Sequence, residues 1–190
     1  MARNDMALFK TDPLLAFCRL TAWFILVSAI GGALVTLIAA AVTLANGDYM
    51  IWVLRHGYPS LQQEGLLVPL FLGLAFIAVA LGLVARFLLY LLDIINSVAR
   101  GEAFTLRNAQ RIKAMAWISL IGMPLGVLIG GTLGRVVLLI GPRAPDAGIR
   151  FETFDGGLGA TQILMTLLLF VLARLFAQAA AMKDEIEGIV

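Results

Sequence analysis

The side chains best suited to hold a cation lie on one polar connection of the sequence. Asp48, His56 and Glu64 follow the first long apolar stretch, and carboxylates and imidazoles are ordinary metal ligands. Solvated loop polarity explains them more simply, so we expect no metal there. His56 is the only histidine, which excludes a histidine-based catalytic triad and any multi-histidine metal site.

The other residues that could do chemistry offer no catalytic constellation. Cys18 is the only cysteine, so an intramolecular disulfide is impossible, and a buried inert thiol is the expectation. The run Gly-Gly-Thr-Leu-Gly at 130–134 resembles a phosphate loop, but it lies inside an apolar stretch. We therefore expect a protein that is not an enzyme and has no cofactor.

Four long stretches without a charged residue dominate the sequence. The chain has 190 residues, of which 61% are hydrophobic and 14% are charged, whereas a soluble domain has roughly 25% charged residues. A helix of about 20 apolar residues crosses a hydrocarbon core of about 30 Å. The sequence therefore predicts an all-α, polytopic membrane protein forming a single domain over residues 1–190. The charge-free stretches are Leu20–Gly47, Gly65–Ala85, Ala114–Gly134 and Gly156–Ala173.

The positions of the basic residues predict the orientation. Ten of the 14 Lys and Arg residues lie in the N-terminal segment, the middle connection or the C-terminal end. Because cytoplasmic loops are rich in Lys and Arg, both termini and the middle connection should be cytoplasmic. The predicted location is the bacterial inner (plasma) membrane, with the lipid bilayer as partner and no direct binding of nucleic acid. The first charge-free stretch is too long for a cleaved signal peptide.

The expected spans cover residues 20–45, 65–92, 106–134 and 156–182. Asn46-Gly47-Asp48 is a turn signal, and Trp52 and Tyr58 in the outward connection after it suit the interfacial aromatic belt. Residues 149–154 alternate between apolar and polar, which indicates a short outward strand. The second and fourth helices should extend into the cytoplasm, the second stopping at Gly101. Thr105 is the expected N-cap of the third.

Two features bear on how the helices pack. Val84-Ala85-Arg86-Phe87 resembles Leu172-Ala173-Arg174-Leu175, which leaves a tandem repeat of two helical hairpins open. Glycines at successive i+4 positions of the third span form a ridge that allows close helix packing. We expect this ridge to pack on Gly31 and Gly32 of the first span, with a homo-oligomer seam as the alternative, and Pro124 to kink the helix. The ridge comprises Gly122, Gly126, Gly130 and Gly134.

Polar residues inside the spans are sparse. Arg86 and Arg174 lie near the predicted cytoplasmic boundary, where their side chains should reach the headgroups. No span has an acidic residue, Lys or His at its centre, which argues against an ion-coupled carrier. The scattered hydroxyls should bond their own helices. They belong to Ser28, Thr36, Thr43, Ser119, Thr132 and Thr166.

Two segments carry a family likeness. The first is G-E-A-F-T-L-R-N-A-Q-R-I at 101–112, and the second is L-A-R-L-F-A-Q-A-A-A-M-K-D-E-I-E at 172–187. They resemble a bacterial four-span membrane family, the domain of unknown function numbered 2975, with its pattern G-x-x-F-S/T-x-x-N-x-x-R-L/I. Its second pattern, L-A-x-x-F-x-x-G-x-x-L-x-x-E, has Ala179 and Met182 at two positions here. The resemblance implies a membrane protein without assigned activity, often encoded beside a small Cro-like helix-turn-helix regulator.

The two motifs predict a packed cytoplasmic cap. Phe104 should insert between the second and fourth helices and touch Leu92, Ile95 or Phe176. Asn108 and Arg111 should face Glu185 and Glu187, and the ring should matter more to stability than these charges. The cap residues are Gly101, Phe104, Thr105, Asn108, Arg111, Phe176 and Glu185. The expected function is non-enzymatic regulation or scaffolding through this surface, possible partners including the helix-turn-helix regulator; the alternative is a transporter or channel accessory subunit.

Overall fold

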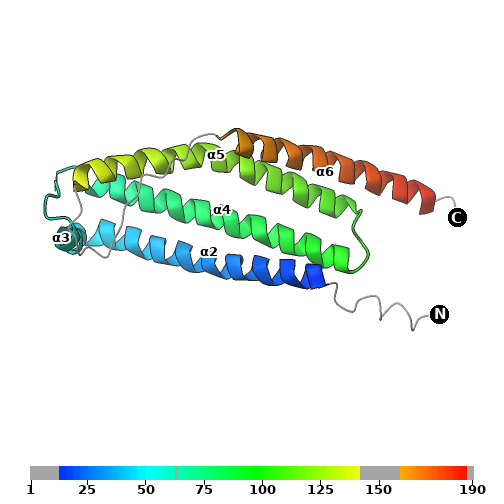
Figure 1. The fold of residues 1–190 in the computed structure, drawn as a ribbon, viewed down its shortest axis with the longest axis horizontal. Helices are drawn as coiled ribbons and strands as arrows, with labels where there is room; N and C mark the ends of the chain where they lie inside the picture. The colour runs from blue at the N-terminus through cyan, green and yellow to red at the C-terminus, as the bar shows by residue number, and fades with distance from the viewer. Residues whose placement is uncertain (1–12, 63, 142–158, 188–190) are drawn as a thin grey trace. The chain divides into compact units, whose positions relative to one another are not determined.

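The computed structural model describes residues 13–62, 64–141 and 159–187, which form five helices and no strand (Figure 1). Four of these helices are long and apolar enough to cross a membrane, as the sequence predicted. The fifth, α3, is short. The helices are α2 (Pro13–Ala45), α3 (Gly47–Gly57), α4 (Leu67–Ala99), α5 (Leu106–Ile140) and α6 (Ala160–Glu187).

The chain divides into two compact units, and α2, α4 and α5 each contribute residues to both. The first unit comprises residues 1–29, 83–121 and 159–190, and its described part contains the predicted cap. There α2 packs on α4 through Ala22, Leu26, Leu88 and Leu92, all buried. These apolar side chains lie at helical spacing on each helix, so one stripe of α2 meets one stripe of α4.

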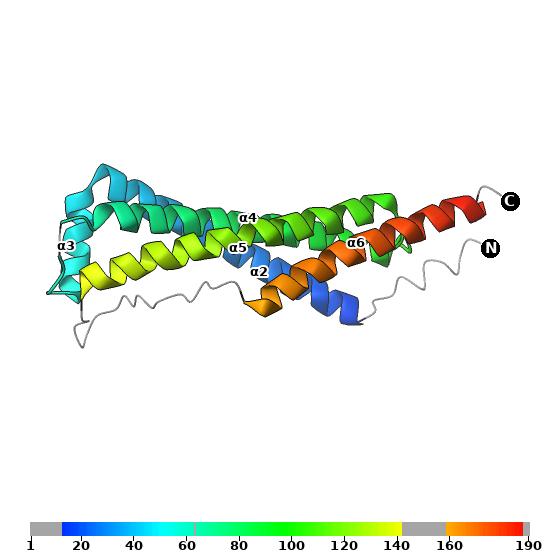
Figure 2. The same ribbon diagram turned by 90° about the horizontal axis from the view of Figure 1, so that it is seen from above.

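Within the first unit, α6 runs antiparallel to α5 (Figure 2). Trp117 of α5 meets Phe170 of α6 edge to face, with ring centroids 5.6 Å apart. The hydroxyls of Ser119 and Thr166, farther along this pair, are 2.7 Å apart. In an antiparallel pair, a step back along α5 corresponds to a step forward along α6. Lys113, one turn before Trp117, is therefore at about the same height as Arg174, one turn after Phe170. This level is the natural boundary between apolar and charged segments.

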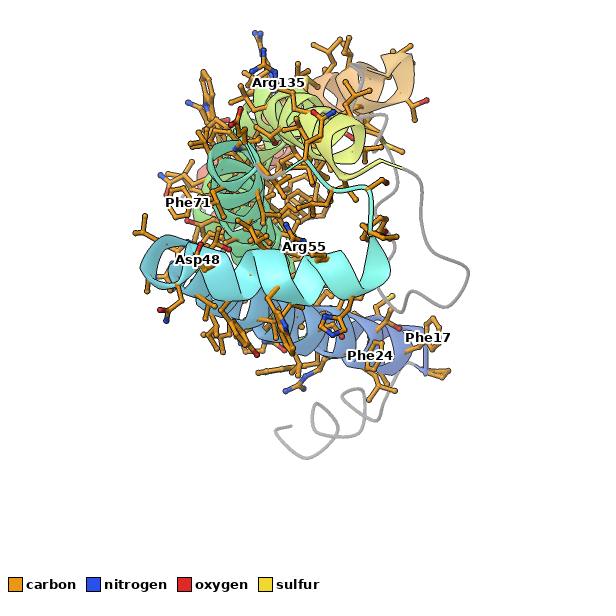
Figure 3. The ribbon with its side chains drawn as sticks, turned by 90° about the vertical axis from the view of Figure 1, so that its left-hand side faces the viewer. Phe17, Phe24, Asp48, Arg55, Phe71 and Arg135 are labelled. Atoms are coloured by element: carbon orange, nitrogen blue, oxygen red, sulfur yellow. The ribbon has the colours of Figure 1, made fainter. Side chains whose placement is uncertain are left out.

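The second unit comprises residues 30–82 and 122–158, and its described part holds a different arrangement. Here α3 lies across the ends of the long helices (Figure 3). Leu54 and Tyr58 pack with Leu66, directly before α4, and with Leu70 in its first turn. They also pack with Val136 and Ile140 at the end of α5. A backbone bond of 2.9 Å from the Gln62 N–H to the Leu139 carbonyl ties the following segment to α5.

The helix α3 occupies much of the expected outward connection, for which the sequence analysis predicted no helix. The predicted turn is limited to Asn46, between the end of α2 and the start of α3. Tyr58 is only 4% exposed, so it belongs to the core and not to an aromatic belt, whereas Trp52 is 59% exposed. The Ile51, Leu54 and Tyr58 side chains are buried because their spacing places them on one helical face.

Three further expectations need correction or fall outside the described residues. Cys18 is exposed on α2 and is not a buried thiol. The helix α6 begins at Ala160, a few residues after the predicted start of the fourth span. The predicted strand at 149–154 lies outside the described residues.

The glycine ridge does not pack as predicted at the positions that can be compared. A Cβ added at Gly122, Gly134 or Gly31 would meet no other heavy atom within 4 Å, so these glycines are not at a close helix contact. At Gly32, in contrast, an added Cβ would lie 3.2 Å from the side chain of Leu81 on α4, so this glycine faces α4. Since Gly122 and Gly134 are open, the homo-oligomer interpretation of the ridge stays a prediction.

Candidate functional site

The site is the connection between α4 and α5, residues 100–105, together with the helical turns on either side. Gly101 has a φ of +78°, a left-handed conformation that costs L-residues roughly 1–2 kcal/mol. The Gly101 N–H bonds the Val98 carbonyl at 2.9 Å, and the Glu102 N–H bonds the Ser97 carbonyl at 3.0 Å. This is the glycine C-cap that the sequence predicted, and it reverses the chain tightly.

The start of α5 is capped as predicted. The Asn108 N–H donates to the Thr105 hydroxyl at 3.3 Å, which satisfies one of the free N–H groups at the helix N-terminus. The helix begins at Leu106, directly after the cap. The two helix ends are therefore only a few residues apart, and both are closed by local hydrogen bonds.

Asn108 fastens this turn from inside. Its side chain is fully buried, with 0% exposure. The amide nitrogen donates to the Ser97 hydroxyl at 2.8 Å and lies 3.1 and 3.0 Å from the carbonyls of Glu102 and Ala103. The Ser97 hydroxyl in turn donates to the Glu102 carbonyl at 2.8 Å. One amide thus joins the last turn of α4, the connection and the first turns of α5.

Arg111 completes the network on the other side of Asn108. Its Nη1 donates to the Asn108 side-chain carbonyl at 3.0 Å, and its Nη2 lies 3.0 Å from an Asp93 carboxylate oxygen. The side chain of Arg111 is 18% exposed and that of Asp93 is 54% exposed. A planar guanidinium can serve two acceptors from different nitrogens, which a lysine ammonium does less well.

This geometry corrects the predicted partners of Asn108 and Arg111. We expected both to face the acidic end of α6. Instead, the Asn108 amide bonds Ser97 and the carbonyls of the connection, and the Arg111 guanidinium pairs with Asp93 of α4. Glu185 is exposed on α6. The side chain of Glu187 is outside the described set. The charged partner therefore lies on α4, the helix before α5, and not on α6 as predicted.

Phe104 meets α6 as predicted, although it is not fully inserted. Its ring centroid lies 5.3 Å from that of Phe176, with the planes tilted by 44°. Aromatic pairs at this separation attract each other. Phe104 nevertheless stays 51% exposed. Of the two alternative neighbours, Leu92 is buried with Ala22 and Leu26, and Ile95 is half-buried. The connection therefore presents an aromatic edge at the surface.

Sequence reasoning missed a second polar cluster, between α5 and α6. The Ser119 hydroxyl shares a 2.7 Å hydrogen bond with that of Thr166 and accepts one of 3.1 Å from the Gln162 amide. The Thr166 hydroxyl also donates to the Gln162 carbonyl at 2.9 Å. The prediction that hydroxyls bond their own helices is confirmed for Thr36, Thr43, Thr132 and Thr166, while Ser119 reaches across. Polar residues on two facing apolar helices would have been the signal.

The candidate cation site has no support in the geometry. Among the described residues, no group of three His, Cys, Asp or Glu side chains could hold a metal ion. His56 lies with its Nδ1 3.0 Å from the Trp52 carbonyl, and since a carbonyl only accepts, Nδ1 carries the hydrogen. The imidazole therefore bonds a carbonyl of its own helix, one turn earlier in the chain.

The network around Asn108 can hold structure but offers no reactive group. Its members are an amide, a hydroxyl, backbone carbonyls and a guanidinium paired with a carboxylate, and in the described residues no buried side-chain nitrogen or oxygen lacks a partner. A saturated buried network rigidifies the segment that it joins. The arrangement therefore fixes the connection and leaves the Phe104 edge at the surface.

Comparison with known proteins agrees with the motifs. Residues 49–190 match the family described as "protein of unknown function (DUF2975)". The chain belongs to this family of unknown function. No curated protein and no solved structure matches it.

The structure gives five of the six specified positions of this family pattern a physical role. Gly101 supplies the left-handed turn, Phe104 contacts α6, and Thr105 caps α5. Asn108 fastens the turn, and Arg111 links Asn108 to α4. The pattern is thus explained by one structural unit, residues 97–111 with Asp93 and Phe176. This unit differs from the predicted cap in including Asp93 and not Glu185, and the word cap refers to it from here on.

Proposed function

We propose that the protein is a non-enzymatic integral protein of the bacterial inner membrane, with both termini cytoplasmic, whose cap binds a cytoplasmic partner. The observation that carries this proposal is the contrast at the connection: Asn108 is fully buried, while Phe104 is left 51% exposed. A turn that served only to join two helices would gain little from an exposed ring, since such positions favour polar residues.

The lengths of the helices support a cap outside the hydrocarbon. At 1.5 Å per residue, α4 continues for about 20 Å after Arg86 and α6 for about 20 Å after Arg174. Exposed apolar residues continue along these extensions, among them Val98 and Met182. The Arg86 guanidinium lies over the Tyr90 ring, 5.0 Å from its centroid and one turn toward the cap. This direction is the one expected of a side chain that reaches from the hydrocarbon toward the headgroups.

The chemistry of this surface suggests the chemistry of the partner. Phe104 and Leu106 are both more than half exposed, and Arg107 beside them is exposed as well. A matching face would offer an apolar pocket for the ring and an acidic rim for the arginine. The small helix-turn-helix regulator implied by the family resemblance is the first partner to test.

The test is binding of the purified regulator to the protein in lipid nanodiscs. Phe104→Ala and Arg107→Glu should each weaken binding at least tenfold, about 1.4 kcal/mol. Leu168→Ala removes an equally exposed apolar side chain from the charge-free part of α6 and is the matched control. Unchanged affinity in both cap variants, or no binding of the regulator at all, would contradict the proposal.

The alternative, a transporter or channel accessory subunit, has weaker support. It needs a continuous polar path, and the polar side chains between α5 and α6 bond one another. Hydrogen bonds of this kind hold membrane helices together and are worth roughly 0.6–2 kcal/mol. We therefore assign the Ser119 cluster to helix association.

A further inference from the structure

The helix α3 is the feature that the proposed function does not use. It is amphipathic: Ile51 and Leu54 are buried in the core of its unit, while Tyr49 and Trp52 are 57% and 59% exposed. The exposed aromatic side chains contact one another. The Tyr49 and Trp52 rings are stacked with centroids 6.1 Å apart, and the His56 ring meets the edge of Trp52 at 4.4 Å.

The charges of this unit show where α3 lies relative to an apolar layer. Within the described part of the unit, every charged side chain is on α3, just after it, or near the end of α5. Figure 3 labels three of them, Asp48, Arg55 and Arg135. The segments of α2 and α4 in this unit, and residues 122–134 of α5, carry no charge. The charged residues are Asp48, Arg55, Glu64 and Arg135.

An apolar layer that ends at α3 places this helix at the boundary between hydrocarbon and water. The direction of α3 agrees, because it crosses the ends of the long helices and does not continue them (Figure 3). Trp and Tyr are enriched at this boundary, since their rings are apolar and their N–H and O–H groups are polar. An amphipathic helix in the plane of the membrane is buried there by about 5–10 Å.

We propose that α3 is an interfacial helix whose exposed Tyr49–Trp52–His56 edge binds the lipid headgroup layer on the outward side of the membrane. The core contacts of Leu54 and Tyr58 fix the helix to the ends of α4 and α5. The ring edge then anchors this end of the unit at a defined depth. The inference rests on insertion of the long helices into a bilayer, and it is independent of any cytoplasmic partner.

The test uses the fluorescence of Trp52 in phospholipid vesicles. Trp23→Phe with Trp117→Phe leaves Trp52 as the only tryptophan. Its emission should be blue-shifted. Lipids brominated near the glycerol end of the acyl chain should quench it more than lipids brominated near the methyl end, and aqueous acrylamide should quench it weakly. If the double variant does not fold, the difference between the wild-type chain and Trp52→Phe gives the same quantity.

The two remaining single-tryptophan chains separate the possible failures. Trp23 and Trp117 lie in the other unit, one turn inside Arg19 and Lys113. Strong acrylamide quenching of Trp52 alone, with the other two quenched by brominated lipid, would overturn the inference and leave membrane insertion intact. Acrylamide quenching of all three tryptophans would overturn insertion itself, and the inference with it.

Discussion

The side-chain amide of Asn108 donates a 2.8 Å hydrogen bond to the hydroxyl of Ser97, which lies 11 positions earlier in the chain. This bond joins the last turn of α4 to the first turns of α5, and the carbonyls of Glu102 and Ala103 accept from the same amide nitrogen. A short connection between helices is thereby converted into a fixed structural element.

Asn108→Ala should be the most damaging polar substitution in the cap. It removes the donor to Ser97 and to two carbonyls and leaves a cavity, so the free energy of unfolding should fall by about 2–4 kcal/mol. Chemical denaturation in detergent micelles measures this loss. Gln110→Ala, which removes an exposed amide two positions later, is the control and should change stability by less than about 0.5 kcal/mol.

The Arg111–Asp93 ion pair should contribute less to the free energy of unfolding than the hydrogen bond from Arg111 to the Asn108 side chain. Because the Asp93 carboxylate is half exposed, Asp93→Asn should cost no more than about 1 kcal/mol. Arg111→Ala should cost more, since it also leaves the buried Asn108 carbonyl without its donor. The same denaturation assay gives the order. A larger loss for Asp93→Asn than for Arg111→Ala would contradict this account of the network.

The geometry revises the expected ranking of Phe104 and Arg111. The sequence suggested that the ring would dominate stability, but the ring is half exposed while Arg111 is largely buried among polar partners. Phe104→Ala should therefore lower the Tm less than Arg111→Ala does, and it should weaken partner binding more. Thermal unfolding and the binding assay on the same two variants decide this, and the opposite pattern in both would restore the earlier ranking.

The hydroxyl pair between α5 and α6 should couple the two helices. In a double-mutant cycle of Ser119→Ala and Thr166→Val, the coupling free energy should be about 0.6–1.7 kcal/mol, the range for polar contacts between membrane helices. Thr166→Val keeps the shape of the side chain, which is 2% exposed, and removes its hydroxyl. Strictly additive effects would show that the 2.7 Å contact contributes nothing.

Two glycines with open surroundings should respond in opposite directions to alanine. No atom lies within 4 Å of a Cβ at Gly101, yet its φ of +78° makes Gly101→Ala unfavourable by about 1–2 kcal/mol. Gly122 is helical and equally open, so Gly122→Ala should be neutral or stabilising by up to about 1 kcal/mol. If Gly122→Ala instead lowers the oligomeric state in cross-linking, the ridge is a homo-oligomer seam.

The long helices and their ends at the connection could be predicted, because they depend on short stretches of sequence. Charge-free length predicted the four long helices, and Gly101 and Thr105 predicted where α4 ends and α5 begins. The helix α3 was missed because Asn46-Gly47 reads as a turn and the segment after it carries charges. The i, i+3, i+7 spacing of Ile51, Leu54 and Tyr58 was the available signal.

The partners of the motif residues could not be predicted in the same way. Asn108 and Arg111 were placed in the cap, but their bonds to Ser97 and Asp93 depend on how α4 and α5 turn about their axes. Acidic groups on both α4 (Asp93) and α6 (Glu185 and Glu187) were available to Arg111, and only the rotation of the helices decides between them. The contact of Phe104 with Phe176 could be predicted because both residues stand in the family motifs, one at the turn and one on the extension of the fourth helix.

The most direct test of the central claim is the side of the membrane on which the cap lies. Glu102→Cys places a thiol on the connection, at a side chain that is 59% exposed, in a Cys18→Ser background. A membrane-impermeant maleimide should label it in inverted membrane vesicles and not in intact spheroplasts, while Asp48→Cys on α3 should show the reverse. Labelling of Glu102→Cys in intact spheroplasts would contradict a cytoplasmic cap and, with it, the proposed function.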